Sequence, residues 1–131
     1  MSFSIHSTSS SRELVFSDHR DEYFKVYIKG DVSAFVEVWA YTDANGLYSL
    51  FQELANYEKP WQGAKSWESI EGEFIISATC SPLGEILFTV QLRGLQGAPE
   101  EWKVSVGLAT EFGQLSNIAK HAKEFFYEPS T

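Results

Sequence analysis

The chain has 131 residues, a length that suits a single domain over 1–131 with one hydrophobic core. Hydrophobic residues make up 44% and aromatic residues 15% of the sequence, which excludes a disordered chain. The formal net charge of -8 opposes nucleic acid and anionic membranes as partners, and the single cysteine, Cys80, excludes an intramolecular disulfide. The first residues lack the features of a signal peptide and no apolar run is long enough to cross a membrane, so we expect a cytoplasmic protein.

Three strands and a helix are predicted in the first half of the sequence. Residues 13–17 are apolar and β-prone, and they end at a polar, turn-like segment. Strict alternation of apolar and polar residues predicts two further strands, over 23–29 and 35–41. Apolar residues at helical spacing over 47–54 then predict an amphipathic helix.

The second half repeats this order of elements. Alternation predicts strands over 74–80, 86–92 and 102–108, the last with Trp102 on its apolar face. A closing amphipathic helix is predicted over 115–126 from its apolar stripe.

The two halves resemble diverged copies of one sequence. Three pairs of segments correspond at spacings of sixty, sixty-four and sixty-eight positions: 13–17 with 73–77, 24–30 with 88–94, and 36–54 with 104–122. Both changes of spacing fall between predicted strands, where an insertion costs little because loop-closure entropy rises slowly with length. The sequence therefore predicts an α+β fold of two strand-strand-strand-helix repeats, at about 13–57 and 73–125, with pseudo-twofold internal symmetry. We expect antiparallel pairing and two helices on one sheet face, while one six-stranded sheet and two three-stranded halves both remain open.

No motif carries recognisable catalytic or cofactor chemistry. The three histidines lie on separate predicted elements, at no spacing that would present them to one metal ion. The glycines match neither a dinucleotide-binding nor a phosphate-binding pattern. Glu68, Glu71 and Glu73 resemble an acid/base set, but carboxylates at the start of a strand are commonly solvated, and we expect that here. The sequence thus predicts no catalytic residue, no metal and no cofactor.

Aromatic residues are the remaining candidates for function. The sheet face opposite the helices is predicted to carry Tyr23, Tyr27, Trp39 and Tyr41, and the connector between the repeats contains Trp61 and Trp67. Such residues are favoured at protein interfaces, although they can equally pack together as a second small core. We expect Trp67 to anchor the connector in the core. The candidate binding residues are Trp39, Tyr41, Trp61, Glu68 and Glu71.

The second half also carries a moderately distinctive pattern. Residues 67–72 read W-x-S-x-E-G, residues 83–84 form a Leu-Gly turn, and residues 113–115 read G-Q-L. This half of the chain resembles an uncharacterised family of small bacterial proteins of unknown function. In its size, acidity and predicted topology the chain is also similar to immunity proteins of bacterial toxin systems. Neither resemblance implies a particular functional residue.

These observations favour a non-enzymatic cytosolic protein-binding module, of which an immunity protein that occludes a toxin is one form. An acidic protein suits a basic partner such as a nuclease, because complementary charge speeds association. The alternative is a small-molecule binding protein or a minor enzyme that uses a cleft between the repeats. The oligomeric state remains open.

Overall fold

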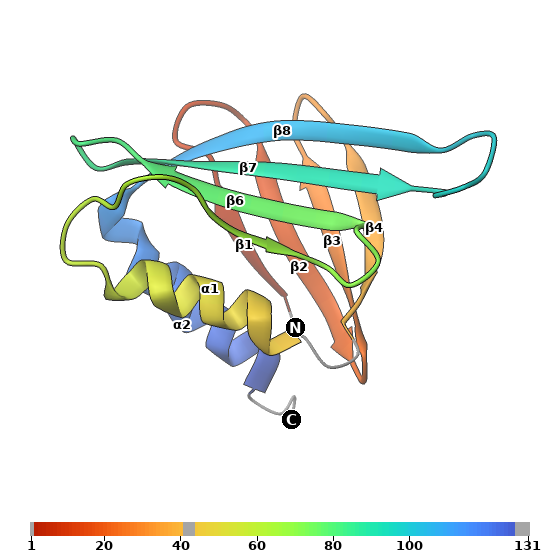
Figure 1. Cartoon of the computed structure of the whole chain (residues 1–131), viewed down its shortest axis with the longest axis horizontal. Helices are drawn as coiled ribbons and strands as arrows, with labels where there is room; N and C mark the ends of the chain where they lie inside the picture. Colours follow the sequence, from red (N-terminus) through yellow and green to blue (C-terminus); the bar gives the residue numbers. More distant parts are fainter. Residues whose placement is uncertain (1, 41–43, 128–131) are drawn as a thin grey trace.

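The computed structural model describes the backbone of residues 2–40 and 44–127, and their side chains except at 44 and 45. The first half forms four strands and a helix: β1 (Ser2–His6), β2 (Glu13–Arg20), β3 (Tyr23–Lys29), β4 (Ala34–Trp39) and α1 (Ala44–Asn56). The second half repeats this order and adds a short 3-10 helix, η1: β5 (Lys65–Glu68), β6 (Phe74–Cys80), β7 (Glu85–Gly94), β8 (Trp102–Glu111), η1 (Phe112–Gln114) and α2 (Leu115–Tyr127). Both helices lie together on the same side of the strands (Figure 1).

Each half forms its own antiparallel sheet, with its strands in chain order. The predicted α+β class, with antiparallel strands followed by a helix in each half, is confirmed. The structure has two sheets rather than one, and each sheet has four strands where the sequence patterns predict three. The additional strands are β1 and β5, which lie at one edge of their respective sheets.

The two additional strands also correspond to each other. Phe3 of β1 lies opposite Phe16, and Trp67 of β5 lies opposite Ile76. Phe16 and Ile76 are sixty positions apart, which is the spacing of the first pair of repeat segments. Phe3 and Trp67 are both buried, so the duplication extends to this strand and Trp67 anchors the connector as expected.

The last strand of each half corresponds at a spacing slightly different from the predicted one. Val26 lies opposite Val36, whereas Val90, its repeat equivalent, lies opposite Val106. The equivalent of Val36 is therefore Val106, at a spacing of seventy, and the predicted pairing with Val104 is two residues out of register. Burial agrees, since Val36 and Val106 are buried while Val104 is half-buried. An alternating pattern hides such an error, because a shift of two residues keeps every side chain on the same face.

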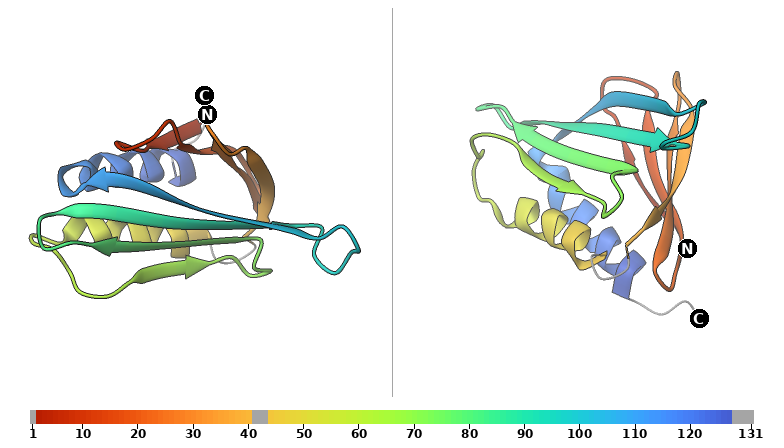
Figure 2. Two further views of the ribbon diagram at one scale, coloured as in Figure 1. Left: turned by 90° about the horizontal axis from the view of Figure 1, so that it is seen from above. Right: turned by 45° about the vertical axis from the view of Figure 1, so that its right-hand side comes forward.

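The two halves share one hydrophobic core. Each helix contacts the first strand of the other half, α1 with β5 and α2 with β1, and the helices also pack against each other. Phe16 lies at the centre of this core, with its ring centroid 6.1 Å from that of Phe51, 5.9 Å from Phe74 and 6.4 Å from Phe125. Figure 2 shows the two sheets crossing at a steep angle with the helices alongside. Neither half encloses its own core, because the buried side chains of both halves form a single cluster.

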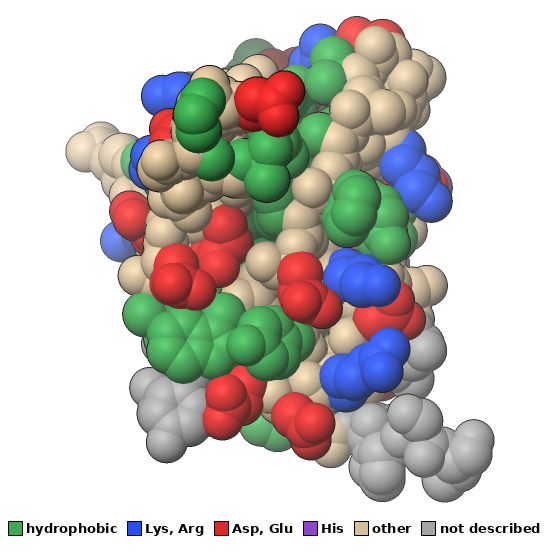
Figure 3. All heavy atoms as spheres, turned by 90° about the vertical axis from the view of Figure 1, so that its right-hand side faces the viewer, with side chains coloured by type: hydrophobic (Ala, Val, Ile, Leu, Met, Phe, Trp, Pro, Cys, Tyr) green, Lys and Arg blue, Asp and Glu red, His purple; other side chains and the backbone are tan. Residues whose placement is uncertain are grey.

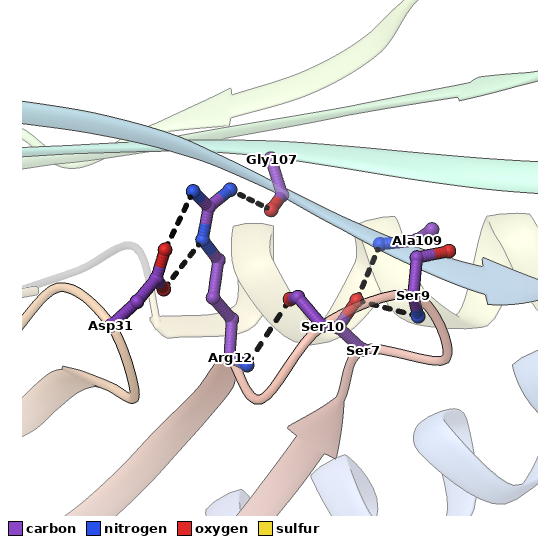
Figure 4. Close-up of polar contacts among 7 residues, drawn as sticks. All are labelled: Ser7, Ser9, Ser10, Arg12, Asp31, Gly107 and Ala109. Atoms are coloured by element: carbon purple, nitrogen blue, oxygen red, sulfur yellow. Dashed lines mark hydrogen bonds and ion pairs between the residues drawn. The ribbon is translucent and has the colours of Figure 1, made fainter.

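The turn between β1 and β2 covers the outer edge of β8 (Figure 4). The N–H of Thr8 donates to the carbonyl of Ala109 over 2.8 Å, and the N–H of Ala109 donates to Oγ of Ser7 over 3.3 Å. Nη1 of Arg12 donates to the carbonyl of Gly107 over 3.0 Å. The unpaired N–H and C=O groups of an edge strand can pair with another chain, and here the β1–β2 turn of the first half covers the edge of β8 in the second half.

The carboxylate of Asp31 holds Arg12 in place for this contact. Nε and Nη2 of Arg12 lie 2.9 Å and 3.2 Å from the two carboxylate oxygens, a bidentate arrangement. This hydrogen bonding raises the pKa of Arg12 and lowers the pKa of Asp31. Asp31 lies in the β3–β4 turn, so the pair joins that turn to the second sheet.

Candidate functional site

An open groove of about 480 Å³ lies between β4 and the β7–β8 hairpin. Phe35, Val36 and Glu37 of β4 line one side, and residues 93–96 with Trp102 line the other. The face of the molecule that carries β4 and the hairpin tip shows hydrophobic patches flanked by acidic side chains (Figure 3).

The groove exists because the β7–β8 hairpin is longer than its counterpart in the first half. β7 and β8 have ten residues each, whereas β3 has seven and β4 has six, and the hairpin projects past β4 (Figures 1 and 2). Its tip is ordered by local bonds, with the N–H of Gly97 donating to Oε1 of Glu101 over 2.7 Å. This N–H, together with the charge of Arg93, holds the pKa of Glu101 below its usual value. Arg93 also forms an ion pair with Glu101, with a 3.5 Å separation.

Apolar side chains give the groove its walls. Phe35 is 54% exposed and Leu95 is 58% exposed, while Trp102 is half-buried. Trp102 lies opposite Gly94, and a Cβ at Gly94 would fall 2.2 Å from the indole. Glycine therefore lets the indole lie directly against the backbone, which fixes one wall of the groove.

A buried carboxylate, Glu73, also contributes to the groove. Glu73 is only 8% exposed, so the expectation that it is solvated is wrong. One oxygen accepts the N–H of Trp39 over 3.3 Å, and the other is bonded to the hydroxyl of Ser69. β6 begins at Phe74, so Glu73 belongs to the preceding turn, where the two-residue alternation of a strand does not apply, and the end of β4 in the other half packs over it. Glu71, which alternation places on the same face, stays exposed.

Comparison with known families settles what the chain is related to. The model of a family of unknown function, DUF6228, matches residues 6–129. The chain belongs to the DUF6228 family. No curated protein and no solved structure matches it. The expected membership of an uncharacterised family is thus confirmed.

Three of the predicted binding residues of the DUF6228 protein do not line the groove but lie next to residues that do. Trp39 is half-buried at the end of β4, where its Nε1 donates to Glu22 over 3.1 Å and its backbone N–H reaches Glu73. Glu71 is exposed, and its carbonyl accepts a hydrogen bond from Gln96 of the hairpin tip over 3.1 Å. Glu68 is exposed as well, next to Arg93, since atoms of both side chains lie within 4 Å of the place where a Cβ on Gly72 would be.

The other two predicted residues do not belong to this site. Trp61 is only 6% exposed, its Nε1 donates to the carbonyl of Ala78 over 3.3 Å, and its ring stacks on Tyr57 at 5.1 Å. Trp61 is therefore packed in the interior, in line with the alternative that the aromatic residues pack together, and it presents little surface to a partner. Its exposure depends on how the connector folds over β6, which no local pattern encodes. Tyr41 lies outside the described residues.

Sequence reasoning missed three residues of the groove. Phe35 shares the alternation of Trp39 over 35–41, which puts it on the same outer face, and an exposed aromatic residue in a strand is itself a signal of binding. Trp102 was assigned to the buried face and does pack against the core, but it is the first residue of β8, at the margin of the core, and is only half-buried. Glu73 gave no signal, because its burial depends on the position of β4 in the other half.

A second, more polar cleft of about 390 Å³ lies between the halves of the DUF6228 protein. Its lining includes Ser4, His6, Thr8, Thr110, Asn117 and His121. His6 lies 3.1 Å from a carboxylate oxygen of Glu13.

Among residues 2–40 and 44–127, no group of three or more His, Cys, Asp or Glu side chains is placed to hold a metal ion. Within the same ranges, no helix has the length and apolar character needed to cross a membrane.

Proposed function

We propose that this protein is a non-enzymatic protein-binding module whose partner docks in the groove between β4 and the β7–β8 hairpin. The observation that carries the proposal is the set of exposed apolar side chains, Phe35 and Leu95, beside the half-buried Trp102. Aromatic groups of this kind supply most of the affinity at protein interfaces when they become desolvated.

The charge around the groove supports a basic partner. Glu37 is exposed in its lining and the carboxylate of Glu73 lies within it, whereas Arg93, which also lines it, is paired with Glu101. Glu71 is exposed next to Gln96 of the lining, and the net charge of the chain is -8. Complementary charge raises association rates and discriminates against acidic partners. The more specific form of the proposal is a cytoplasmic immunity protein that occludes a basic toxin, for which acidity and small size are the supporting features.

Site-directed photo-crosslinking tests the proposal. A crosslinking amino acid is placed at Phe35, at Leu95 and, as a control, at Leu83, which is 94% exposed in the β6–β7 turn at the opposite end of the second sheet. Irradiation in the native host should give one common adduct from positions 35 and 95, and none of this adduct from position 83. An adduct that forms equally well at position 83, or no adduct at 35 and 95, would place the interface elsewhere.

The polar cleft between the halves is the observation that favours the alternative, a small-molecule binding protein or minor enzyme. A ligand there should raise the melting temperature of the parent protein by mass action but not that of an Asn117→Leu variant, because the amide of Asn117 lines the cleft. A metabolite library without such a selective stabiliser would argue against this use of the cleft.

A further inference from the structure

β4 is an edge strand whose backbone faces the groove. Directly after β4, the N–H of Ala40 donates to the carbonyl of Glu22, the residue that precedes β3, over 2.8 Å. In an antiparallel pair the bonded residues alternate, so Ala34, Val36 and Val38 also bond to β3. The N–H and C=O groups of Phe35, Glu37 and Trp39 consequently point away from β3, toward the groove.

One of these three outward positions is already occupied. The N–H of Trp39 is bonded to the carboxylate of Glu73, which therefore marks one end of the available edge. Within the described part of the chain, no hydrogen bond joins the backbone of Phe35 or Glu37 to any residue outside the first sheet. Two consecutive outward positions are thus available to a strand lying in the groove.

The equivalent edge of the second sheet is treated differently. At the spacing of seventy that relates β4 to β8, Glu37 and Trp39 correspond to Gly107 and Ala109. Both of those residues are hydrogen-bonded by the β1–β2 turn (Figure 4). The edge of β8 is therefore covered by the β1–β2 turn, whereas the related edge of β4 faces an open groove.

We propose that an extended segment of a partner protein adds to β4 as a fifth strand of the first sheet, an inference that rests on the proposed function. Main-chain bonds to Phe35 and Glu37 would hold the segment, and its side chains would alternate between the two faces. On the outer face they meet the exposed carboxylate of Glu37, whereas on the inner face they meet Val36 and Trp102. The segment recognised therefore alternates basic with apolar residues.

A second copy of this chain fits the edge less well. Pairing through β4 would bring two acidic grooves together, each with Glu37 at its rim and Glu73 within it, on chains of net charge -8. Like charges placed opposite each other across strands are destabilising. A basic segment of a different protein meets no such repulsion.

The test uses an acetylated, amidated hexapeptide of alternating Lys and Val, with backbone amide NMR of the full chain as the readout. Titration to millimolar concentration should shift the amide signals of residues 34–37 and 93–96, and an alternating Glu and Val peptide should not shift them. N-methylation of one alternate set of peptide amides should abolish binding, while methylation of the other set should leave it nearly unchanged, because only one set faces β4. Absence of these shifts, or equal tolerance of both methylation patterns, would overturn strand addition.

Substitutions at Glu37 provide a second measurement. Its N–H faces the groove, so Glu37→Pro removes this donor without breaking a bond to β3, and proline is tolerated at such edge positions. We expect Glu37→Pro to weaken peptide binding by at least about tenfold, whereas Glu37→Gln keeps the donor and weakens it only about two- to threefold. If Glu37→Pro is folded and binds as tightly as the parent, strand addition is wrong.

The same variants separate the inference from the proposed function. A crosslink from Phe35 that persists with full yield in folded Glu37→Pro would retain the groove as a binding site and reject the added strand. A concentration-dependent dimer of the parent that becomes monomeric in Glu37→Pro would show that the occupant is a second copy, which overturns the proposed partner.

Discussion

Truncation of Phe16 tests whether the two halves form one cooperative unit. Phe16 is fully buried in β2, and its ring contacts Phe3 at 4.6 Å in addition to the rings from α1, β6 and α2. Phe→Ala in a core costs about 3–5 kcal/mol. We expect the upper part of this range, because neighbours on four separate elements cannot all move in to fill the cavity. A chain of this length has a total stability of about 7–20 kcal/mol at 0.05–0.15 kcal/mol per residue, so the loss is severe.

The assay is urea unfolding followed by both tryptophan fluorescence and far-UV circular dichroism. Trp67 and Trp102 belong to strands of the second half and Trp61 of the connector is bonded to β6, so fluorescence mainly reports the half that does not contain the substitution. With a urea dependence of about 2 kcal/mol per M, Phe16→Ala should lower the midpoint by about 2 M in both signals. Leu83→Ala, at an exposed position, should stay within about 0.5 kcal/mol of the parent. A fluorescence midpoint that does not move while circular dichroism shows an earlier transition would refute the shared core.

Three further outcomes follow from named contacts. Leu50→Ala and Ile118→Ala remove repeat-equivalent buried side chains from the two packed helices, so each should cost about 2–5 kcal/mol in urea unfolding, and midpoints equal to the parent would contradict the packing. Asp31→Asn should destabilise the protein at neutral pH, because the folded-state pKa of Asp31 is lowered by Arg12. The difference from the parent should disappear as the pH falls from the ordinary carboxyl pKa of about 3.9 through that lowered value, and a constant difference would contradict the ion pair. Gly30→Ala should cost at least about 1–3 kcal/mol by thermal unfolding, since Gly30 has φ of 131° and a Cβ would lie 2.8 Å from the backbone of the β1–β2 turn; an unchanged melting temperature would show that the turn can move aside.

The parts of the fold that could be predicted are those with a clear period. Alternation over 23–29 matches β3, and the apolar stripe over 47–54 lies within α1, because one buried face imposes its period on the sequence. β1 and β5 have five and four residues, too few for an alternation to stand out. Their presence follows from pairing with β2 and β6, which is a tertiary property.

The site could be predicted only in part for the same reason. Trp39, Glu68 and Glu71 were expected to be accessible; none of them lines the groove, but each lies next to a residue that does, Glu73, Arg93 and Gln96 respectively. Trp61 was expected to join them, yet the connector turns it inward against β6. Residue type indicates what a side chain can do, whereas the path of a connector decides whether it meets solvent.

The groove arises where the two copies differ most. Leu92 and Val104 pair across the β7–β8 hairpin as Ile28 and Ala34 pair across the β3–β4 hairpin. The chain between Leu92 and Val104 is six residues longer than the chain between Ile28 and Ala34. The additional residues lengthen the β7–β8 hairpin, put Trp102 at the margin of the core, and place a wall opposite the edge of β4. The regions that are alike in both copies form the shared core, where a change in one residue affects its packed neighbours. A new surface therefore arises most easily in a connection between strands, because added length there costs little loop-closure entropy. We infer that asymmetry between the repeats is a better guide to the functional site than the repeated pattern itself.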